Sequence, residues 1–278
     1  ETGATLTVNT GLVNTFGGSL NDAGAGQLSL IKTGTGTLNL NGFNQYTGAT
    51  IVNGGTLRLN FPGGGTLPST NSIIVNGGIL RISSDQTFKD LTITGGGTLQ
   101  VDAGVNLVIT GVYSPAVCNI RNDGKITLQG TAMQFFPGLS ANIISMNNLE
   151  VNNFSGVSMN KSLNIAGVLT LSNGLFTVAG NTLTINNPIA ANANNLSANN
   201  ISSITIAGTV VGVDLPASVN QLNNFTVSNT VGSTLQGNLS VSGNLFISIN
   251  AGLVDADFSL NGTGNLIMTG GNLQLGKN

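Results

Sequence analysis

The chain has 278 residues, with 8 basic and 10 acidic side chains, no histidine, no tryptophan and one cysteine. Charged residues make up only 6% of the sequence, which argues against a nucleic-acid-binding protein, because such proteins neutralise phosphates with Lys and Arg. The absence of His and the single Cys exclude the usual zinc sites and any Ser-His or Cys-His nucleophilic mechanism, and no cofactor is expected.

The chain opens Glu1-Thr2-Gly3, without the basic start and apolar core of a signal peptide. It also lacks a run of about 20 apolar residues, so no membrane-spanning helix is predicted. We therefore expect a mature or excised piece of a longer protein. Hydrophobic residues at 40% indicate that this piece is folded.

Short runs with apolar residues at every second position follow one another along the chain, as expected for strands with one inward face. Asn and Gly separate the runs, as at Asn53-Gly54-Gly55 and Asn76-Gly77-Gly78, and both residue types tolerate the positive φ of tight corners. No segment shows helical periodicity. The runs include Leu28-Ser29-Leu30, Leu38-Asn39-Leu40, Leu57-Arg58-Leu59, Leu80-Arg81-Ile82, Leu91-Thr92-Ile93, Leu99-Gln100-Val101 and Leu107-Val108-Ile109.

The spacing of these runs predicts an all-β fold, a right-handed parallel β-helix, because three short strands and three corners make a coil of roughly 20 residues. Leu163, Leu169, Phe176 and Leu183 follow one another at intervals of six to seven. We expect one continuous β-helix over 1–278, with a change of repeat style near 112 and an irregular excursion at 191–197.

Two related multi-coil repeats are predicted at about 141–187 and 217–262. Asn147-Asn148-Leu149 matches Asn223-Asn224-Phe225, and Leu163 matches Leu239 at the same offset along the chain. This offset suggests about four coils, and a solenoid can add whole coils without changing its cross-section.

Residues 31–59 read IKTGTGTLNLNGFNQYTGATIVNGGTLRL. The segment resembles the autotransporter-associated β-strand repeat of bacterial passenger domains in its Lys32, its two Gly-Thr-Leu-x-Leu elements and its Asn44-x-Tyr46-Thr-Gly48. The rest of the chain is similar in composition to large Gram-negative surface solenoids, including type IX secretion substrates. The resemblance implies a parallel β-helix, export, and a role at the cell surface or in the medium, and it brings no catalytic residues.

Asp255 and Asp257 are the one candidate pair for a metal. Their spacing of two would place both carboxylates on one face of a strand, where they could bind calcium. The preferred interpretation is two solvated charges beside a corner, so no metal site is assigned.

Two charged groups suggest an alternative function, a polysaccharide lyase or glycosidase on a β-helix. One runs from Arg121 to Lys125, in which Gly124 is expected to mark a turn. The other comprises Arg81, Asp85, Lys89 and Asp90 around a loop at Ser83-Ser84. Glycosidases need paired carboxylates, and only Asp255/Asp257 and Asp85/Asp90 come close, so charged corners are the preferred interpretation and no catalytic residue is assigned.

Aromatic residues supply one further candidate, a contact patch at Phe135 and Phe136. Both side chains cannot point inward on a regular strand, so one of them is expected to be exposed. Tyr46 is expected to pack, as part of the repeat pattern, and Cys118 is expected to be a buried small hydrophobe.

Together these features predict a structural or adhesive β-solenoid segment of a large bacterial cell-surface or secreted protein, and not an enzyme. Its expected partners are neighbouring β-helix segments or subunits that stack end to end, and surface glycans or a host or prey cell surface. Nucleic acid is not among them. A glycan-binding module is the remaining alternative.

Overall fold

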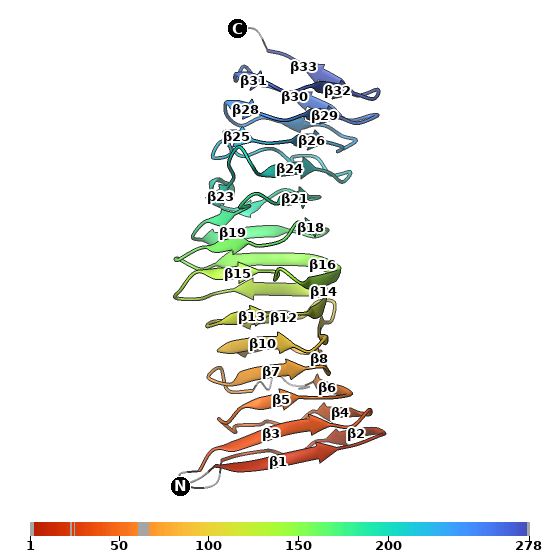
Figure 1. Ribbon diagram of the computed structural model, residues 1–278, viewed down its shortest axis with the longest axis vertical. Helices are drawn as coiled ribbons and strands as arrows, with labels where there is room; N and C mark the ends of the chain where they lie inside the picture. The colour runs from red at the N-terminus through yellow and green to blue at the C-terminus, as the bar shows by residue number, and fades with distance from the viewer. Residues whose placement is uncertain (1–2, 23, 25, 61–66, 277–278) are drawn as a thin grey trace. The chain divides into compact units, whose positions relative to one another are not determined.

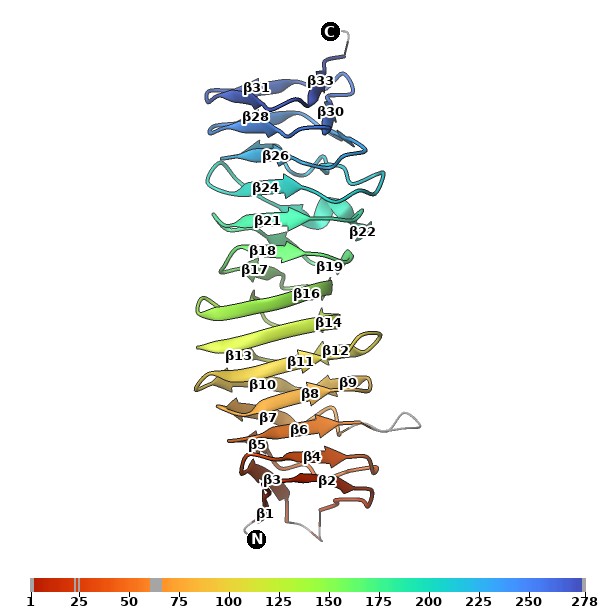
Figure 2. The same ribbon diagram turned by 90° about the vertical axis from the view of Figure 1, so that its right-hand side faces the viewer.

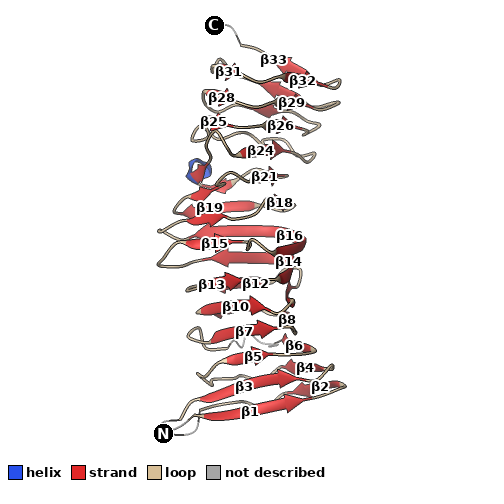
Figure 3. Ribbon diagram, viewed as in Figure 1, coloured by secondary structure: helices blue, strands red, loops and turns tan. Residues whose placement is uncertain are grey.

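The computed structural model describes residues 3–22, 24, 26–60 and 67–276, so Glu1 and Thr2 lie outside the described residues. In these ranges the regular elements are strands, apart from the 3-10 helix η1 (Ala193–Asn195), which confirms the all-β prediction (Figure 3). The helix lies in the stretch expected to be irregular. Within those ranges, no helix has the length and apolar character needed to cross a membrane.

The chain divides into two compact units. Unit 1 comprises Glu1–Ala132 with Gly138–Met146, and unit 2 comprises Met133–Pro137 with Asn147–Asn278. Strand β16 (Ala141–Asn152) begins in the first unit and ends in the second. The single continuous β-helix, the style change near 112 and the two multi-coil repeats stay predictions.

Unit 1 is built from parallel strands that alternate between two main sheets, with neighbours in each sheet contributed by successive coils (Figures 1 and 2). The first sheet contains β1 (Ala4–Asn9), β3 (Leu28–Thr33), β5 (Thr50–Val52), β7 (Ser72–Asn76), β10 (Asp90–Thr94) and β13 (Tyr113–Pro115). The second contains β2 (Val13–Phe16), β4 (Thr37–Leu40), β6 (Thr56–Leu59), β8 (Ile79–Ile82), β11 (Gly97–Val101) and β14 (Cys118–Leu128). On a third side, β9 (Gln86–Phe88) pairs with β12 (Asn106–Ile109), which pairs with the end of β14.

Unit 2 repeats the arrangement on three sides. One side carries β15 (Gln134–Phe136), β17 (Val157–Met159), β20 (Phe176–Thr177) and β23 (Leu196–Ser197). The second carries β18 (Leu163–Ile165), β21 (Thr182–Ile185), β24 (Ser203–Ile206), β26 (Phe225–Val227), β29 (Leu245–Ile247) and β32 (Leu266–Met268). The third carries the end of β16, β19 (Leu169–Asn173) and β22 (Ala190–Ala191). Later coils add two three-stranded sheets, β25 (Gln221–Leu222), β28 (Leu239–Val241) and β31 (Leu260–Gly262), and β27 (Ser233–Thr234), β30 (Gly252–Val254) and β33 (Asn272–Gln274).

The coil length is about 21 residues, close to the length expected from sequence. Leu163, Leu169 and Phe176 lie in three different sheets, and Leu183 stands directly over Leu163 one coil later. The interval of six to seven residues is therefore the step from one side of the coil to the next. This confirms the β-solenoid fold.

The core is filled by columns of apolar side chains, one from each coil. The column Leu38, Leu57, Leu80, Leu99 and Ile120 is formed by register partners on β4, β6, β8, β11 and β14, and each of these side chains is buried. Each coil covers the apolar surface of the next, which is the main source of stability in such a stack.

The offset between the matched segments does not correspond to four coils. In unit 2, the residue that stands four coils after Leu163 in the strand register is Leu245. Leu239, the residue that matches Leu163 in sequence, lies in a different sheet. What the matched segments share is a corner: the side-chain Oδ1 of Asn148 accepts the Val168 N–H at 2.8 Å, and that of Asn224 accepts the Asn244 N–H at 2.8 Å. The sequence similarity therefore follows local corner chemistry on two different sides of the coil.

Residues Arg121 to Lys125 lie within β14, which passes from the side of β11, where Asn122 pairs with Val101, to the side of β12, where Lys125 pairs with Asn106. The segment therefore runs over the corner of the preceding coil without leaving the strand. The expectation that Asp255 and Asp257 share a strand face was wrong. Asp255 and Asp257 lie after β30 in a turn in which the Phe258 N–H donates to the Asp255 carbonyl at 3.0 Å. Ala256 and Asp257 have φ of 51° and 67° there, so the two carboxylates do not share a strand face.

Candidate functional site

All three arginines of the chain stand in one outward column of unit 1. Arg58 on β6 pairs in register with Arg81 on β8, Arg81 with Gln100 on β11, and Gln100 with Arg121 on β14. Each residue lies between two inward-facing neighbours, so the strand alternation directs it outward. Neighbouring strands are about 4.8 Å apart, which brings these side chains into reach of one another.

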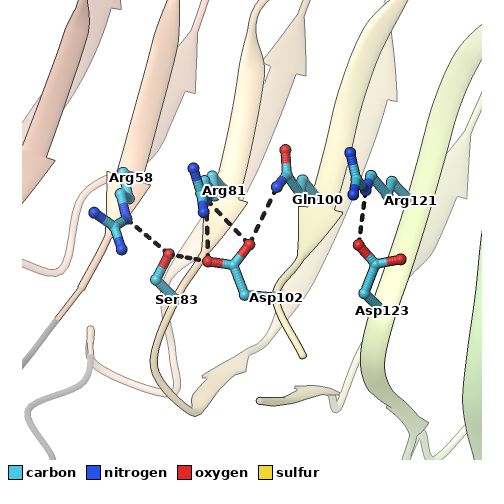
Figure 4. A network of polar contacts seen from close by, with 7 residues as sticks. All are labelled: Arg58, Arg81, Ser83, Gln100, Asp102, Arg121 and Asp123. Atoms are coloured by element: carbon cyan, nitrogen blue, oxygen red, sulfur yellow. Dashed lines mark hydrogen bonds and ion pairs between the residues drawn. The ribbon is translucent and has the colours of Figure 1, made fainter. Parts of the chain in front are cut away.

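Asp102 lies beside this column and accepts hydrogen bonds from two of its members (Figure 4). Arg81 Nε donates to both of its carboxylate oxygens at 3.0 Å, Ser83 Oγ donates at 2.6 Å and Gln100 Nε2 at 3.1 Å. Partial burial acts to raise the pKa of Asp102, but the hydrogen bonds from Ser83 and Arg81 outweigh it and hold the pKa below its usual range. Asp102 is therefore ionised at neutral pH.

A second pair continues the pattern on β14. Arg121 Nε donates to Asp123 at 2.7 Å, and Ser145 Oγ donates to the other carboxylate oxygen at 2.7 Å. The hydrogen bond from Ser145, followed by that from Arg121, lowers the pKa of Asp123. The second carboxylate is thus also held in its charged form.

Arg58 has a different environment. Its Nε donates to Ser83 Oγ at 2.8 Å, and among the described residues no carboxylate lies within ion-pair distance of it. Arg58 and Arg81 are connected to the same carboxylate, Arg81 directly and Arg58 through Ser83 (Figure 4). This network links consecutive coils on the outer face of the sheet, where exposed ion pairs contribute about 0–1 kcal/mol each.

The repeat segment contains a lysine, Lys32, whose burial was not predicted from the sequence. Lys32 is fully buried, and its Nζ donates to the carbonyl oxygens of Thr33, Gly34 and Gly54. Burial lowers the pKa of this lysine. Because Gly54 lies one coil after Lys32, the ammonium ties two coils together at a corner.

Tyr46 packs in the core, as expected. Its hydroxyl lies 2.6 Å from Thr50 Oγ1, and Asn71 Nδ2 donates to the Tyr46 carbonyl at 2.9 Å. The Lys32 and Tyr46 positions of the repeat pattern thus make structural contacts at two corners, one after β3 and one before β5. Cys118 is also buried, as expected.

Of the two calcium candidates, Asp255 bonds to backbone N–H groups, whereas Asp257 is exposed. Asp255 is buried, and its Oδ1 accepts the N–H groups of Asp257 at 3.1 Å and of Gly276 at 2.6 Å. Within the described part of the chain there is no group of three or more His, Cys, Asp or Glu side chains that could hold a metal ion.

The second pair considered for catalysis has similar structural contacts. Asp85 Oδ1 accepts the Asn106 N–H at 2.8 Å, and Asp90 Oδ1 accepts the Val112 N–H at 2.7 Å. Arg81 of the same group faces Asp102 instead. The side chains of Arg81, Asp85 and Asp90 thus bond to different parts of the fold.

The contact-patch candidates separate as the strand alternation requires. Phe136 is fully buried in β15, whereas Phe135 is 52% exposed. In register, Phe135 stands beside Ser158 on β17 and then Thr177 on β20. A contact at this place would therefore combine one aromatic ring with hydroxyl groups.

The sequence alone did not reveal the arginine column. Arg58, Arg81 and Arg121 each follow a buried apolar residue on a strand. The stretch from Arg58 to Arg81 covers one coil and that from Arg81 to Arg121 covers two, but the coils differ in length, so no fixed period connects the three. Register information was needed to place them together.

Comparison with known proteins supports the resemblance over the repeat segment. Residues 30–59 match the passenger-associated-transport-repeat family. Over 117 residues, or 41% of this chain, the sequence is 32% identical to the Adhesin BmaC autotransporter of Brucella suis biovar 1 (strain 1330). The chain spans about 3% of the length of that relative. No solved structure matches the chain.

Proposed function

We propose that this chain is a structural and adhesive β-solenoid segment of a large autotransporter-type passenger, exposed at the bacterial surface or released from it. The observation that carries the proposal is the combination of parallel coils with a passenger repeat at 30–59 and likeness to an adhesin. The outward side chains described above mostly bond to the adjacent coil, which suits a stalk that keeps its register under load.

An enzymatic role is not the function that the geometry favours. The carboxylates of Asp85, Asp90 and Asp255 accept backbone N–H groups, and those of Asp102 and Asp123 face arginines. A glycosidase needs two carboxyl groups that flank one bond. The contacts of these carboxylates are those of side chains that hold coils and corners together.

The proposal includes a position outside the cell. The passenger repeat supports export by an autotransporter route, whereas the compositional likeness to type IX substrates offers a second route. Treating intact cells of the source organism with a protease separates an exposed from an internal location. Loss of the segment from intact cells is expected, and protection until lysis would contradict surface exposure.

We also propose that the coil ends pair with further β-helix segments. In the last described coils of unit 2, Leu245, Leu260, Leu266, Leu273 and Leu275 help to line an open apolar cavity of about 280 Å³. Leu245 is 8% exposed, whereas its register partner Leu266, one coil later, is 53% exposed. A further coil would cover this surface and pair with the edges of β31, β32 and β33.

Adhesion can be tested with the chain coupled to beads. Beads that carry the chain should bind host-cell monolayers or glycan-coated surfaces more than beads with an inert protein of the same size. Phe135→Ser should reduce binding, and Leu139→Ser, at another exposed apolar position, should not. Equal binding by both bead types would show that the segment only spaces other modules. Turnover in a polysaccharide panel would overturn the non-enzymatic interpretation.

A further inference from the structure

The sequence Val-Asn-Gly-Gly occurs twice in unit 1, at Val52 to Gly55 and at Val75 to Gly78. Asn53 follows β5 and Asn76 ends β7, and both asparagines are exposed. Asn-Gly sequences are prone to attack of the Gly nitrogen on the Asn side chain, because Gly has no Cβ to hinder the approach. The two sites have the same intrinsic reactivity, so any difference in rate between them in the folded chain comes from the structure.

The attacking nitrogen differs between the two corners. The Gly77 N–H donates to the Thr94 carbonyl at 3.1 Å, so this hydrogen bond must break before the nitrogen can attack. The Gly54 N–H has no hydrogen-bond partner among the described residues. Only the amide of Gly54 is free to react without first breaking a hydrogen bond.

The hydrogen bonds of the two asparagine side chains also favour reaction at Asn53 over Asn76. Asn76 uses both ends of its amide, donating from Nδ2 to Asn53 Oδ1 at 3.4 Å and accepting the Thr94 hydroxyl at 3.3 Å. Asn53 Nδ2, the leaving nitrogen, has no described partner. The donor from Asn76 also points at the Asn53 oxygen, on which negative charge develops during attack.

We propose that Asn53 is a site of spontaneous deamidation and that Asn76 is protected by the fold. The Gly54 nitrogen loses its proton to solvent and forms a bond to Asn53 Cγ, and the side-chain nitrogen leaves as ammonia. Water then opens the cyclic imide at either carbonyl, giving aspartate or isoaspartate at position 53. No oxidant or reductant takes part.

The product alters the corner that Lys32 holds. An isoaspartate adds a methylene to the main chain directly before Gly54, whose carbonyl accepts a hydrogen bond from Lys32 Nζ at 3.2 Å. The carbonyl would be displaced from the ammonium. A passenger that stays outside the cell for long periods would therefore accumulate a chemical change at its repeat segment.

The test is peptide mapping by mass spectrometry after incubation of the folded chain in mildly alkaline buffer at physiological temperature. The deamidated product should form at Asn53 at roughly five times the rate at Asn76 or faster. One protecting hydrogen bond alone can account for such a difference in rate. In the urea-unfolded chain the two rates should become equal. Equal rates in the folded chain, or faster reaction at Asn76, would overturn the proposal.

Gly54→Ala provides a matched variant, because a Cβ at this position would meet the Gly34 carbonyl oxygen at 3.2 Å and needs only a small shift. The added methyl group should slow the reaction at Asn53 and leave the rate at Asn76 unchanged. An unchanged rate at Asn53 would show that Gly54 is not the attacking residue.

Discussion

Individual residues of the repeat segment stabilise the coils through buried hydrogen bonds and packing. The buried ammonium group of Lys32 donates hydrogen bonds to three carbonyl oxygens in place of water. Tyr46 packs in the core, and its hydroxyl is hydrogen-bonded to Thr50. Buried polar groups are tolerated when they keep such partners, and removing a partner exposes the full cost of desolvation. A repeat pattern that looks like a sequence signature is therefore explained by side-chain contacts.

Lys32→Ala is expected to destabilise the fold by about 3 kcal/mol, because it leaves three carbonyl groups without their donor and creates a cavity. Urea unfolding followed by circular dichroism measures this loss. Lys89→Ala removes an exposed lysine and should change stability by less than about 0.5 kcal/mol. Similar losses for both variants would show that the Lys32 contacts contribute little.

Both tyrosines of the chain are buried, and burial raises the pKa of Tyr46 to about 12 and that of Tyr113 well above its usual range. Because the folded pKa exceeds the unfolded value of about 10, their contribution to stability is complete below that value. This contribution falls as the pH rises above the unfolded pKa toward the folded pKa. Near-ultraviolet absorbance should show almost no tyrosinate in this interval until the chain unfolds, and a full tyrosinate signal in the folded state would contradict the burial.

At the scale of strands, side chains of matching chemistry stack from coil to coil on the outward face as well as on the inward face. Inward columns collect apolar residues, whereas Arg81 and Arg121 of the outward column face the carboxylates of Asp102 and Asp123, which lie two residues beyond the column along the chain. Side chains that differ in charge can then bridge one coil to the next. Such contacts favour one register over a slipped one, because a slip would separate Arg81 from Asp102.

Asp102→Asn should lower stability at neutral pH by about 1 kcal/mol, since it weakens the bond to Arg81. The folded pKa of Asp102 lies below its unfolded value of about 3.9, so this stabilisation is present above that pH. It is lost as the pH falls through the folded pKa. Denaturant midpoints measured across this range should converge for the wild-type and variant chains, and high salt should also shrink their difference. A loss that persists unchanged in acid would point to packing instead.

At the scale of the whole molecule, each unit stacks coils of similar cross-section, and such stacking does not by itself limit the number of coils. Interior coils cover one another, while the last described coils of unit 2 leave an apolar cavity and strand edges open. Exposed strand edges are templates for further pairing. We therefore expect self-association through this surface when the chain is studied alone.

Leu273→Lys is expected to reduce this self-association, because the charge would lie in the open cavity. Its register partner Leu253, one coil earlier, is buried, so the position is an inward one. Sedimentation velocity over a concentration series measures the effect. Leu139→Lys, at a position that is already 75% exposed, should leave association unchanged. A chain that stays monomeric at high concentration would show that the end is not a pairing surface.

The sequence alone determined the kind of fold. Alternating apolar residues, Asn-Gly corners and the spacing from Leu163 to Leu183 all depend on interactions within one coil, which spans about 21 residues. The strand alternation likewise predicted that Phe135 and Phe136 face opposite ways. The passenger-type repeat was recognisable because its pattern is also local.

Only the tertiary structure decided which residues stand above one another. In unit 1 the coil that leads from Ile73 to its register partner Leu91 is shorter than the coil that leads from Leu6 to Leu30, so loop lengths set the register anew at each coil. This is why the arginine column, the burial of Lys32 and the mismatch between the repeat offset and the coils could not be predicted. The turn at Asp255 was missed for a related reason: its geometry depends on the Gly276 N–H one coil later.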